Sequence, residues 1–169
     1  MLKKLLILFI AIAPMAVVAQ NLRIAYINTN EIMSAMPELS GIQAQVAERH
    51  EQMRATIQVL ETDYINRLSE FQALPENTSE TIMQDRLREL QQLQERMQAL
   101  LQSSEVELFQ LWQTLIEPVH RRVSEAIQAV ANEGGYTFVF DVGVEQSQLV
   151  FVSDNASNIT QAVRTRLGI

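Results

Sequence analysis

The sequence predicts an α+β protein in which a long antiparallel helical hairpin is inserted into a small β body, between the first strand and the last two. Three observations lead to this fold class. None of the five glycines falls within residues 42–133, so more than half of the 169-residue chain has no flexible backbone position. Apolar residues recur at helical spacing through most of that stretch. Segments rich in β-branched and aromatic residues lie at both ends of it.

Residues 1–19 have the pattern of an export signal. Lys3 and Lys4 precede a short apolar run, and a small residue, Ala19, stands where signal peptidase would cut before Gln20. The apolar run is shorter than the ~20 residues that a membrane-spanning helix needs, which disfavours a transmembrane anchor. We therefore expect export, cleavage between Ala19 and Gln20, and a mature chain that begins at Gln20. Export of a chain without cysteine fits a bacterial periplasm.

Cleavage would also change the charge balance, because Lys3 and Lys4 are the only lysines. The mature chain would keep eleven arginines against twenty acids, a net charge of −9. Neither nucleic acid nor an anionic lipid surface suits such a chain, since proteins bind both through basic patches. The sequence contains no cysteine, which excludes a disulfide framework, a thiolate zinc site and a thiol nucleophile.

The mature chain opens with a strand at residues 22–27, in which Leu22, Ile24 and Tyr26 share one face. A short helix follows, with capping residues at 28–31, and stops at Pro37. We assign residues 20–37 and 118–169 to the β body, and residues 38–117 to a helical arm.

The arm consists of two helical segments, residues 38–73 and 80–117, with a tip at residues 74–79. In each segment the seam positions average close to 3.5 residues apart when the one position without an apolar residue is counted, which is the repeat of a coiled coil. The second seam comprises Met83, Leu87, Leu90, Leu93, Met97, Leu101, Leu108, Leu111 and Leu115, with Ser104 as its polar member. Segments of similar length, each roughly 55 Å long at ~1.5 Å per residue, are expected to fold back on each other.

The helical pattern continues past Pro118 to Gly134, and the proline is expected to bend the helix where the arm meets the body. Two strands follow, at residues 136–141 and 148–152, and a terminal helix begins near Asn158. A body of roughly sixty residues buries too little apolar surface to be stable alone. We therefore expect the chain to oligomerise through its sheet.

The sequence gives no support for catalysis. Glu117 and His120 have the Glu-x-x-His spacing of di-iron bundles, but Ala47 stands where the other histidine, His50, would need a glutamate. A glycine-rich phosphate loop and a Gly-x-Ser-x-Gly elbow are also missing from the sequence. We expect no catalytic residue, no bound metal and no cofactor.

The arm is rich in glutamine, with thirteen between Gln43 and Gln113. One interpretation is a solvated helix surface, with methionines filling gaps in the seam. The other is an adaptable surface of amides and flexible thioethers that binds apolar clients without strict specificity.

Several short segments occur in a characteristic order. They are Ile24 to Asn28 with Pro37 downstream, Ile116 to Val119 leading to Ala126-Ile127 and Val130-Ala131, Gly135 to Asp141, and Asp154 followed by Asn158 to Thr160 and Val163 to Leu167. In this order they resemble the Skp (OmpH-like) family of periplasmic chaperones. The resemblance covers essentially the whole mature chain.

The resemblance implies a homotrimer in which each chain gives strands to a shared β body, and three helical arms surround a cavity. Such proteins hold unfolded outer-membrane proteins there without ATP. In this chain the trimer body would use Ile24, Tyr26, Phe138, Phe140, Val150 and Val152. Arm side chains would hold the client, and the candidates are Met53, Ile57, Leu60, Met83, Leu93 and Met97.

The arm departs from the better-known members of that family, which are basic with lysine-rich tips. Residues 43–113 hold six arginines and twelve acids here. We therefore expect client capture through apolar and amide contacts, with a weak dependence on salt, and no strong direct lipid binding. An alternative function is a structural coiled-coil adaptor that binds one folded partner at the arm tips near Pro75, and a metal-binding enzyme is a more distant one.

Overall fold

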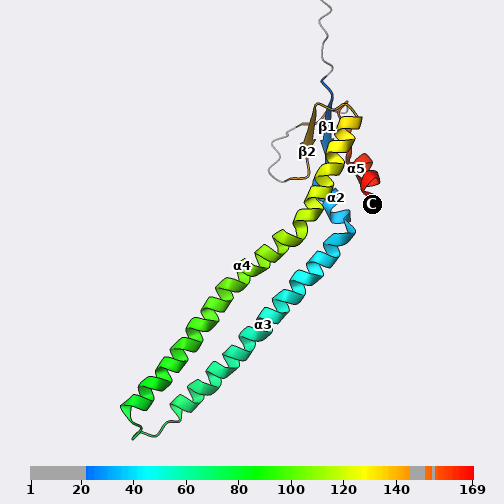
Figure 1. The fold of residues 1–169 in the computed structure, drawn as a ribbon. Helices are drawn as coiled ribbons and strands as arrows, with labels where there is room; N and C mark the ends of the chain where they lie inside the picture. The colour runs from blue at the N-terminus through cyan, green and yellow to red at the C-terminus, as the bar shows by residue number, and fades with distance from the viewer. Residues whose placement is uncertain (1–21, 145–150, 154) are drawn as a thin grey trace, which may run out of the picture.

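The computed structural model describes residues 22–144, 151–153 and 155–169, and it has the α+β character that the sequence predicts. A small sheet and two short helices lie at one end of a long pair of helices (Figure 1). The elements are β1 (Ile24–Ile27), α2 (Thr29–Ala35), α3 (Pro37–Gln72), α4 (Glu80–Glu133), β2 (Phe138–Asp141), β3 (Ser157–Asn158) and α5 (Thr160–Leu167). Ala19, Gln20 and the rest of the expected export signal lie outside the described residues.

The short helix α2 begins and ends where its sequence indicates. The Asn28 side chain accepts a hydrogen bond from the backbone N–H of Glu31, which caps the first turn. Met36 is extended, with φ −69° and ψ 122°, because the residue before a proline is biased away from the helical region. Pro37 then occupies the first turn of α3, where its missing N–H costs no hydrogen bond.

Helices α3 and α4 lie side by side and are joined by residues 73–79 (Figure 1). Their cross-helix ion pairs, taken from the tip toward the sheet, are Arg67–Glu89, Arg49–Glu107 and Glu38–Arg122. In this order residue numbers fall along α3 and rise along α4, so the two helices run in opposite directions. Helix α4 passes through Pro118 without ending, and Figure 1 shows its axis turning toward the sheet at that end.

Among the described residues, no helix combines the length and the apolar composition that crossing a bilayer would require.

The three strands form one parallel sheet in the order β2-β1-β3. The expected third strand at residues 148–152 is wrong where it can be compared: Phe151 and Val152 are not in a strand, and residues 148–150 lie outside the described range. The observed third strand is Ser157–Asn158, which pairs with Ala25 and Tyr26. Its position follows from α5, because burial of Ile159 and Val163 at the start of that helix brings the preceding residues alongside β1.

The hydrophobic core lies on one side of this sheet, against α2, α5 and the last turns of α4. Its fully buried side chains include Ile27, Ile32 and Val163. Asn158, the expected cap of the terminal helix, accepts a hydrogen bond from the backbone N–H of Thr160 at 2.9 Å, although the helix itself starts after Ile159.

Candidate functional site

The sheet has one packed face and one exposed apolar face. Successive strand residues point to opposite faces, so Ala25 and Ile27 face the core while their neighbours on β1 face away from it. In the parallel register, Ile24 lies beside Phe138 and Tyr26 lies beside Phe140. We call the surface made by Ile24, Tyr26, Phe138 and Phe140 the apolar sheet face.

Over the residues that the structure describes, the apolar sheet face is largely open to solvent. Phe138 is 52% exposed and Phe140 is 40% exposed, and their ring centroids are 6.3 Å apart. Four of the residues that the family resemblance assigned to the trimer body therefore form one continuous patch. Val152 is half-buried in a hollow that three residues of this patch also line, with the 79% exposed Phe151 next to it. Val150 lies outside the described residues.

The ends of β1 and β2 are fixed by a carboxylate. The Asp141 side chain accepts hydrogen bonds from the backbone N–H groups of Thr29, at 3.1 Å, and Gly143, at 2.9 Å, and from the Thr29 hydroxyl. A Cβ at position 143 would stand 2.9 Å from the backbone nitrogen of Asn30, so glycine is required for this close approach. Asp141 thus positions the start of α2 against the sheet, as expected of a capping residue.

The predicted client-binding residues lie mainly between the two long helices. Met53 and Leu60 are buried, and Ile57, Leu93 and Met97 are half-buried. Met83, at 38%, is the exposed member of the set. Ser104 is buried in the same seam, where its hydroxyl donates to the backbone carbonyl of Leu100 at 2.6 Å. The coiled-coil spacing had identified residues that join α3 to α4, and these have little surface left for a client.

A different set of apolar side chains faces solvent on the helix pair. It comprises Val59, Ile65, Ile82, Leu87, Leu101, Val106 and Phe109. Leu87 and Leu101 were expected in the seam, but they are 44% and 52% exposed, and Leu100 is the half-buried neighbour. The signal that could have found this set is an apolar residue placed off the seam, where a solvated helix surface would carry a polar one.

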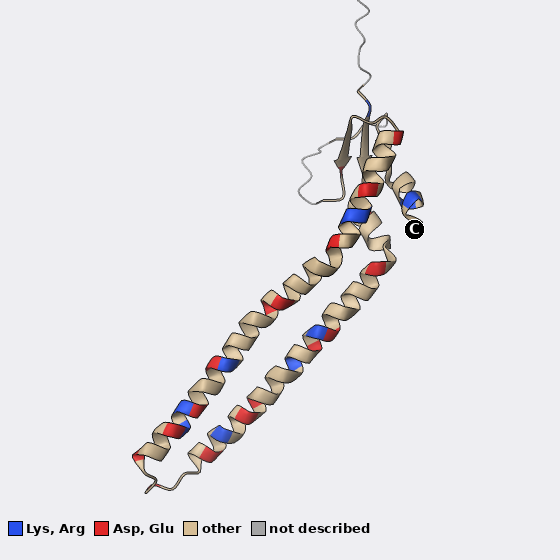
Figure 2. Cartoon of the chain, in the orientation of Figure 1, with Lys and Arg blue, Asp and Glu red and all other residues tan. Residues whose placement is uncertain are grey.

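Charged residues are numerous along the helix pair (Figure 2). Most of the arginines in residues 43–113 are paired with acids. The pairs include Arg49–Glu107, Arg54–Glu51, Arg86–Glu89 and Arg88–Asp85. Hydrogen bonds from Arg86, and less strongly from Arg67, lower the pKa of Glu89. Because acids outnumber arginines two to one in residues 43–113, pairing leaves an excess of negative charge.

The residues considered for a metal are not assembled into a site. Glu117 and His120 are exposed on α4, and His50 is exposed on α3. Over the ranges that the structure describes, no group of three or more potential metal ligands comes together.

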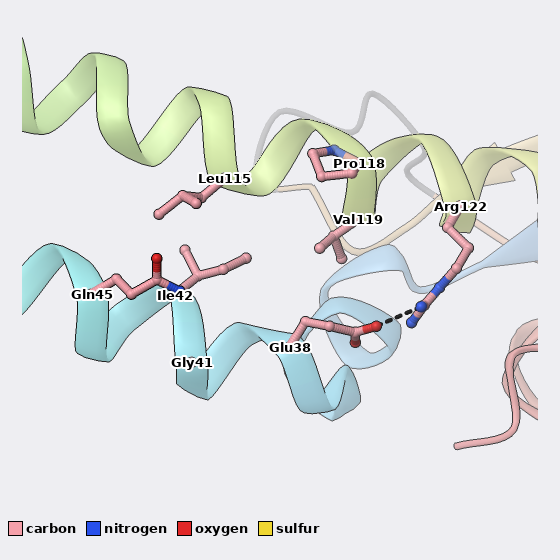
Figure 3. Close-up of a pocket in the computed structure, with 8 residues that line it drawn as sticks. All are labelled: Glu38, Gly41, Ile42, Gln45, Leu115, Pro118, Val119 and Arg122. Carbon is pink, nitrogen blue, oxygen red and sulfur yellow. Dashed lines mark ion pairs between the residues drawn. The ribbon is translucent and has the colours of Figure 1, made fainter.

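An open groove lies between the first turns of α3 and the Pro118 region of α4 (Figure 3). Ile42, Leu115 and Val119 project into the space between the helices, and Glu38 points toward Arg122 at its sheet end. The Glu38 carboxylate forms an ion pair with Arg122. A hydrogen bond from the backbone of Glu38 itself, followed by the one from Arg122, lowers the pKa of this carboxyl below its ordinary value of 4.5.

Glu38→Gln is expected to destabilise the protein at pH 7 by about 0.5 kcal/mol, the scale of a partly exposed ion pair. The lowered pKa means that the carboxylate stabilises the fold above about pH 4.5, and that this contribution is lost as pH falls through the folded-state value. Urea unfolding at several pH values measures it. The difference between wild type and variant should vanish in acid, and a difference that persists at low pH would show that the carboxylate charge is not its cause.

Comparisons with known proteins agree with this architecture. The model of the family described as outer membrane protein (OmpH-like) matches residues 23–167. A crystal structure from Caulobacter crescentus, described as an OmpH-like outer membrane chaperone, is similar with a TM-score of 0.69 and 17% sequence identity, over 85% of this chain and 82% of that one. At that identity the likeness shows the fold alone. No curated protein matches the sequence significantly. Because the family match spans nearly all of the described residues, this chain belongs to the OmpH-like outer membrane protein family.

Proposed function

We propose that this protein is an exported chaperone that holds unfolded outer-membrane β-barrel proteins without ATP, and that it acts as a homotrimer. Membership of the OmpH-like family supports the chaperone role. The observation that carries the rest is the apolar sheet face at the base of a long helix pair. Ile24, Phe138 and Phe140 are each at least 39% exposed in the single chain, and a patch of this kind on a small domain is typical of an interaction surface.

A second copy of the chain is the partner that best fits this face. The described sheet has only three strands, the outer ones four and two residues long, and such a sheet gains stability when its bare face and edges are covered. Three copies arranged around a common axis would cover the sheet face of every chain in the same way, as closed cyclic symmetry requires. In this arrangement residues 20–37 and 118–169 form the body, and residues 38–117 form the arm.

Meeting through the sheets leaves the helix pairs free to project from the body. Figure 1 shows α3 and α4 extending away from the sheet on one side only. Three such pairs around one axis would surround a space whose walls are long, parallel to one another and open at the tips. An unfolded chain held there would be kept from other unfolded chains, which is what a holdase does.

The proposal is tested by aggregation suppression. At least two unrelated outer-membrane β-barrel proteins, diluted from denaturant, should stay soluble when the protein is present, with no nucleotide added. Light scattering follows the aggregation. Protection of none of them would reject the holdase function, and tight binding to one folded partner through the tip near Pro75 would favour the adaptor.

Client binding is expected to depend only weakly on salt. Most arm arginines are already in ion pairs, so few positive charges are free to attract an acidic client. Raising the ionic strength from about 0.05 to 0.5 M shortens the screening length severalfold, yet the dissociation constant should change by less than about threefold if apolar contacts dominate. A loss of binding over this range would show that charge attraction is the main contact.

A further inference from the structure

The two long sides of the helix pair differ in chemistry. Glu89 and Glu107 are 18 residues apart on α4, which is about five full turns, so both lie on the same side of that helix. They pair with Arg67 and Arg49, which have the same separation on α3. We call the side that carries these cross-helix ion pairs the charged side.

The opposite side is joined by a neutral contact. Gln94 donates a hydrogen bond to the Tyr64 hydroxyl at 2.9 Å. Gln94 is five residues beyond Glu89, which places it about 140° around α4 from that residue, across the seam. We call the side that carries Gln94 and Tyr64 the neutral side.

A stripe of uncharged residues runs along α4 on the neutral side. Counted from Gln94 in both directions in steps of three or four residues, the positions of this stripe lie within about 60° of Gln94 around the helix. Leu90, Met97 and Leu108 fall in this window but are buried or half-buried in the seam. The other apolar members of the stripe are Met83, Leu87, Leu101, Phe109 and Trp112, and between Leu87 and Leu101 it carries Gln91, Gln94 and Gln98. Phe109 is 64% exposed and Leu101 is 52% exposed. Between Met83 and Trp112, Glu105 is its one charged residue.

Helix α3 adds a less uniform strip to the neutral side. Ile65, next to Tyr64, is 63% exposed, while Ile57 and Leu68 are half-buried at the margin of the seam. Arg54 and Glu61 lie on the same side and contribute one charge of each sign. The side as a whole therefore has little net charge.

We infer that the neutral side is the client-binding face, and that its occupant is an extended, charge-poor segment of an unfolded polypeptide with apolar side chains. This inference rests on the proposed chaperone function and specifies which face of the helix pair performs it. Glutamine amides both donate and accept hydrogen bonds, so they suit a backbone whose peptide groups are unpaired. The exposed leucine, methionine and aromatic side chains suit the apolar residues that alternate along a barrel strand.

A helix of a second copy fits this face less well. Helix-to-helix packing needs apolar residues sustained at a short repeat. Leu87 and Leu101 are fourteen positions apart, and the exposed residues of the stripe between them are glutamines. The charged side is also a poor site for a charge-poor segment, because its ion pairs would have to be desolvated. An unfolded polypeptide on the neutral side needs no regular apolar repeat and desolvates no cross-helix ion pair.

Exposed apolar residues on the two sides provide a matched test. Ile65 and Phe109, 63% and 64% exposed, belong to the neutral side. Val59 and Ile82, 68% and 48% exposed, lie toward the charged side. Val59 is about 140° around α3 from Tyr64, and Ile82 is about two turns from Glu89 on the same side of α4. The test pair is Ile65→Ser with Phe109→Ser, and the control pair is Val59→Ser with Ile82→Ser.

The test pair should weaken binding of an unfolded outer-membrane β-barrel protein about tenfold or more, and the control pair by less than about twofold, with helix content unchanged in both. A photo-crosslinking amino acid at position 65 or 109 should capture the client, and one at 59 or 82 should not. Equal losses or equal crosslinking from both sides would overturn the inference but leave the holdase function intact. Crosslinks between copies of this chain from 65 or 109 would identify a second copy as the occupant. Failure of the wild type to hold any client would overturn both.

Discussion

Phe138→Ser combined with Phe140→Ser is expected to convert the proposed trimer into single chains. Both rings lie on the apolar sheet face, away from the core, and are 52% and 40% exposed in the single chain. Each ring that becomes buried between copies contributes roughly 1.5–3 kcal/mol. The double change therefore removes several kcal/mol from every chain's contribution to assembly, enough to weaken association by at least about a hundredfold.

The measurement is the mass in solution, by light scattering or sedimentation, across a range of concentrations. Wild type should have the mass of three chains and the variant that of one, with helix content retained because the substituted rings do not support the core. Phe109→Ser is the matched control, since it removes an exposed phenylalanine from α4 rather than from the sheet and should leave the mass unchanged. An unaltered mass in the double variant would show that the copies meet elsewhere. A monomeric wild type would rule out a β body shared between copies.

The order and type of most elements could be predicted because each has a strong local signal. Asn28 caps α2, Pro37 separates α2 from α3, and the glycines at 134 and 135 follow the end of α4. The alternation of β1 also groups Ile24 with Tyr26, and the parallel register places Phe138 and Phe140 beside them. These features depend on residues close together in the chain or on a simple period.

The third strand was predicted at the wrong place because its cause is not local. Phe151 and Val152 have high β-propensity, yet they pair with no strand. Ser157 and Asn158 have low propensity and do pair, because the following helix is docked into the core. The backbone N–H of Ile159 donates to the Tyr26 carbonyl at 3.0 Å, and the backbone N–H of Asn28 donates to the Thr160 hydroxyl at 3.0 Å. Tertiary packing decides here against intrinsic preference.

The predicted client-binding residues lie mostly in the seam for a related reason. A heptad pattern identifies the residues that two helices use on each other, so Met53 and Leu60 are buried once the pair forms. Residues free to bind a partner are those that depart from the pattern, such as Ile65 and Phe109. Recognising them requires the pairing of α3 with α4, and the choice between the two sides further requires the ion pairs and the Gln94–Tyr64 hydrogen bond.

Substitution of Asp141 is expected to have a second large effect, on the free energy of unfolding rather than on assembly. Its carboxylate is the acceptor for two backbone N–H groups and one hydroxyl at the junction of β2, α2 and the Gly143 turn. Asp141→Ala would leave these three donors without their acceptor in a partly buried site. Loss of an acceptor costs roughly 1–3 kcal/mol per unsatisfied buried group, and solvent reaching this junction would reduce that sum. We expect the free energy of unfolding to fall by about 2–4 kcal/mol.

Asp141→Asn separates this positioning role from any role that needs the negative charge. The asparagine Oδ1 can still accept from the backbone N–H groups of Thr29 and Gly143, which both bond to Oδ1 of the aspartate, and its amide can donate to the Thr29 hydroxyl. Only the charge is lost, so the cost should stay below about 1 kcal/mol. Urea unfolding of both variants gives the two values. An asparagine variant as unstable as the alanine variant would show that charge, rather than hydrogen bonding, holds α2 against the sheet.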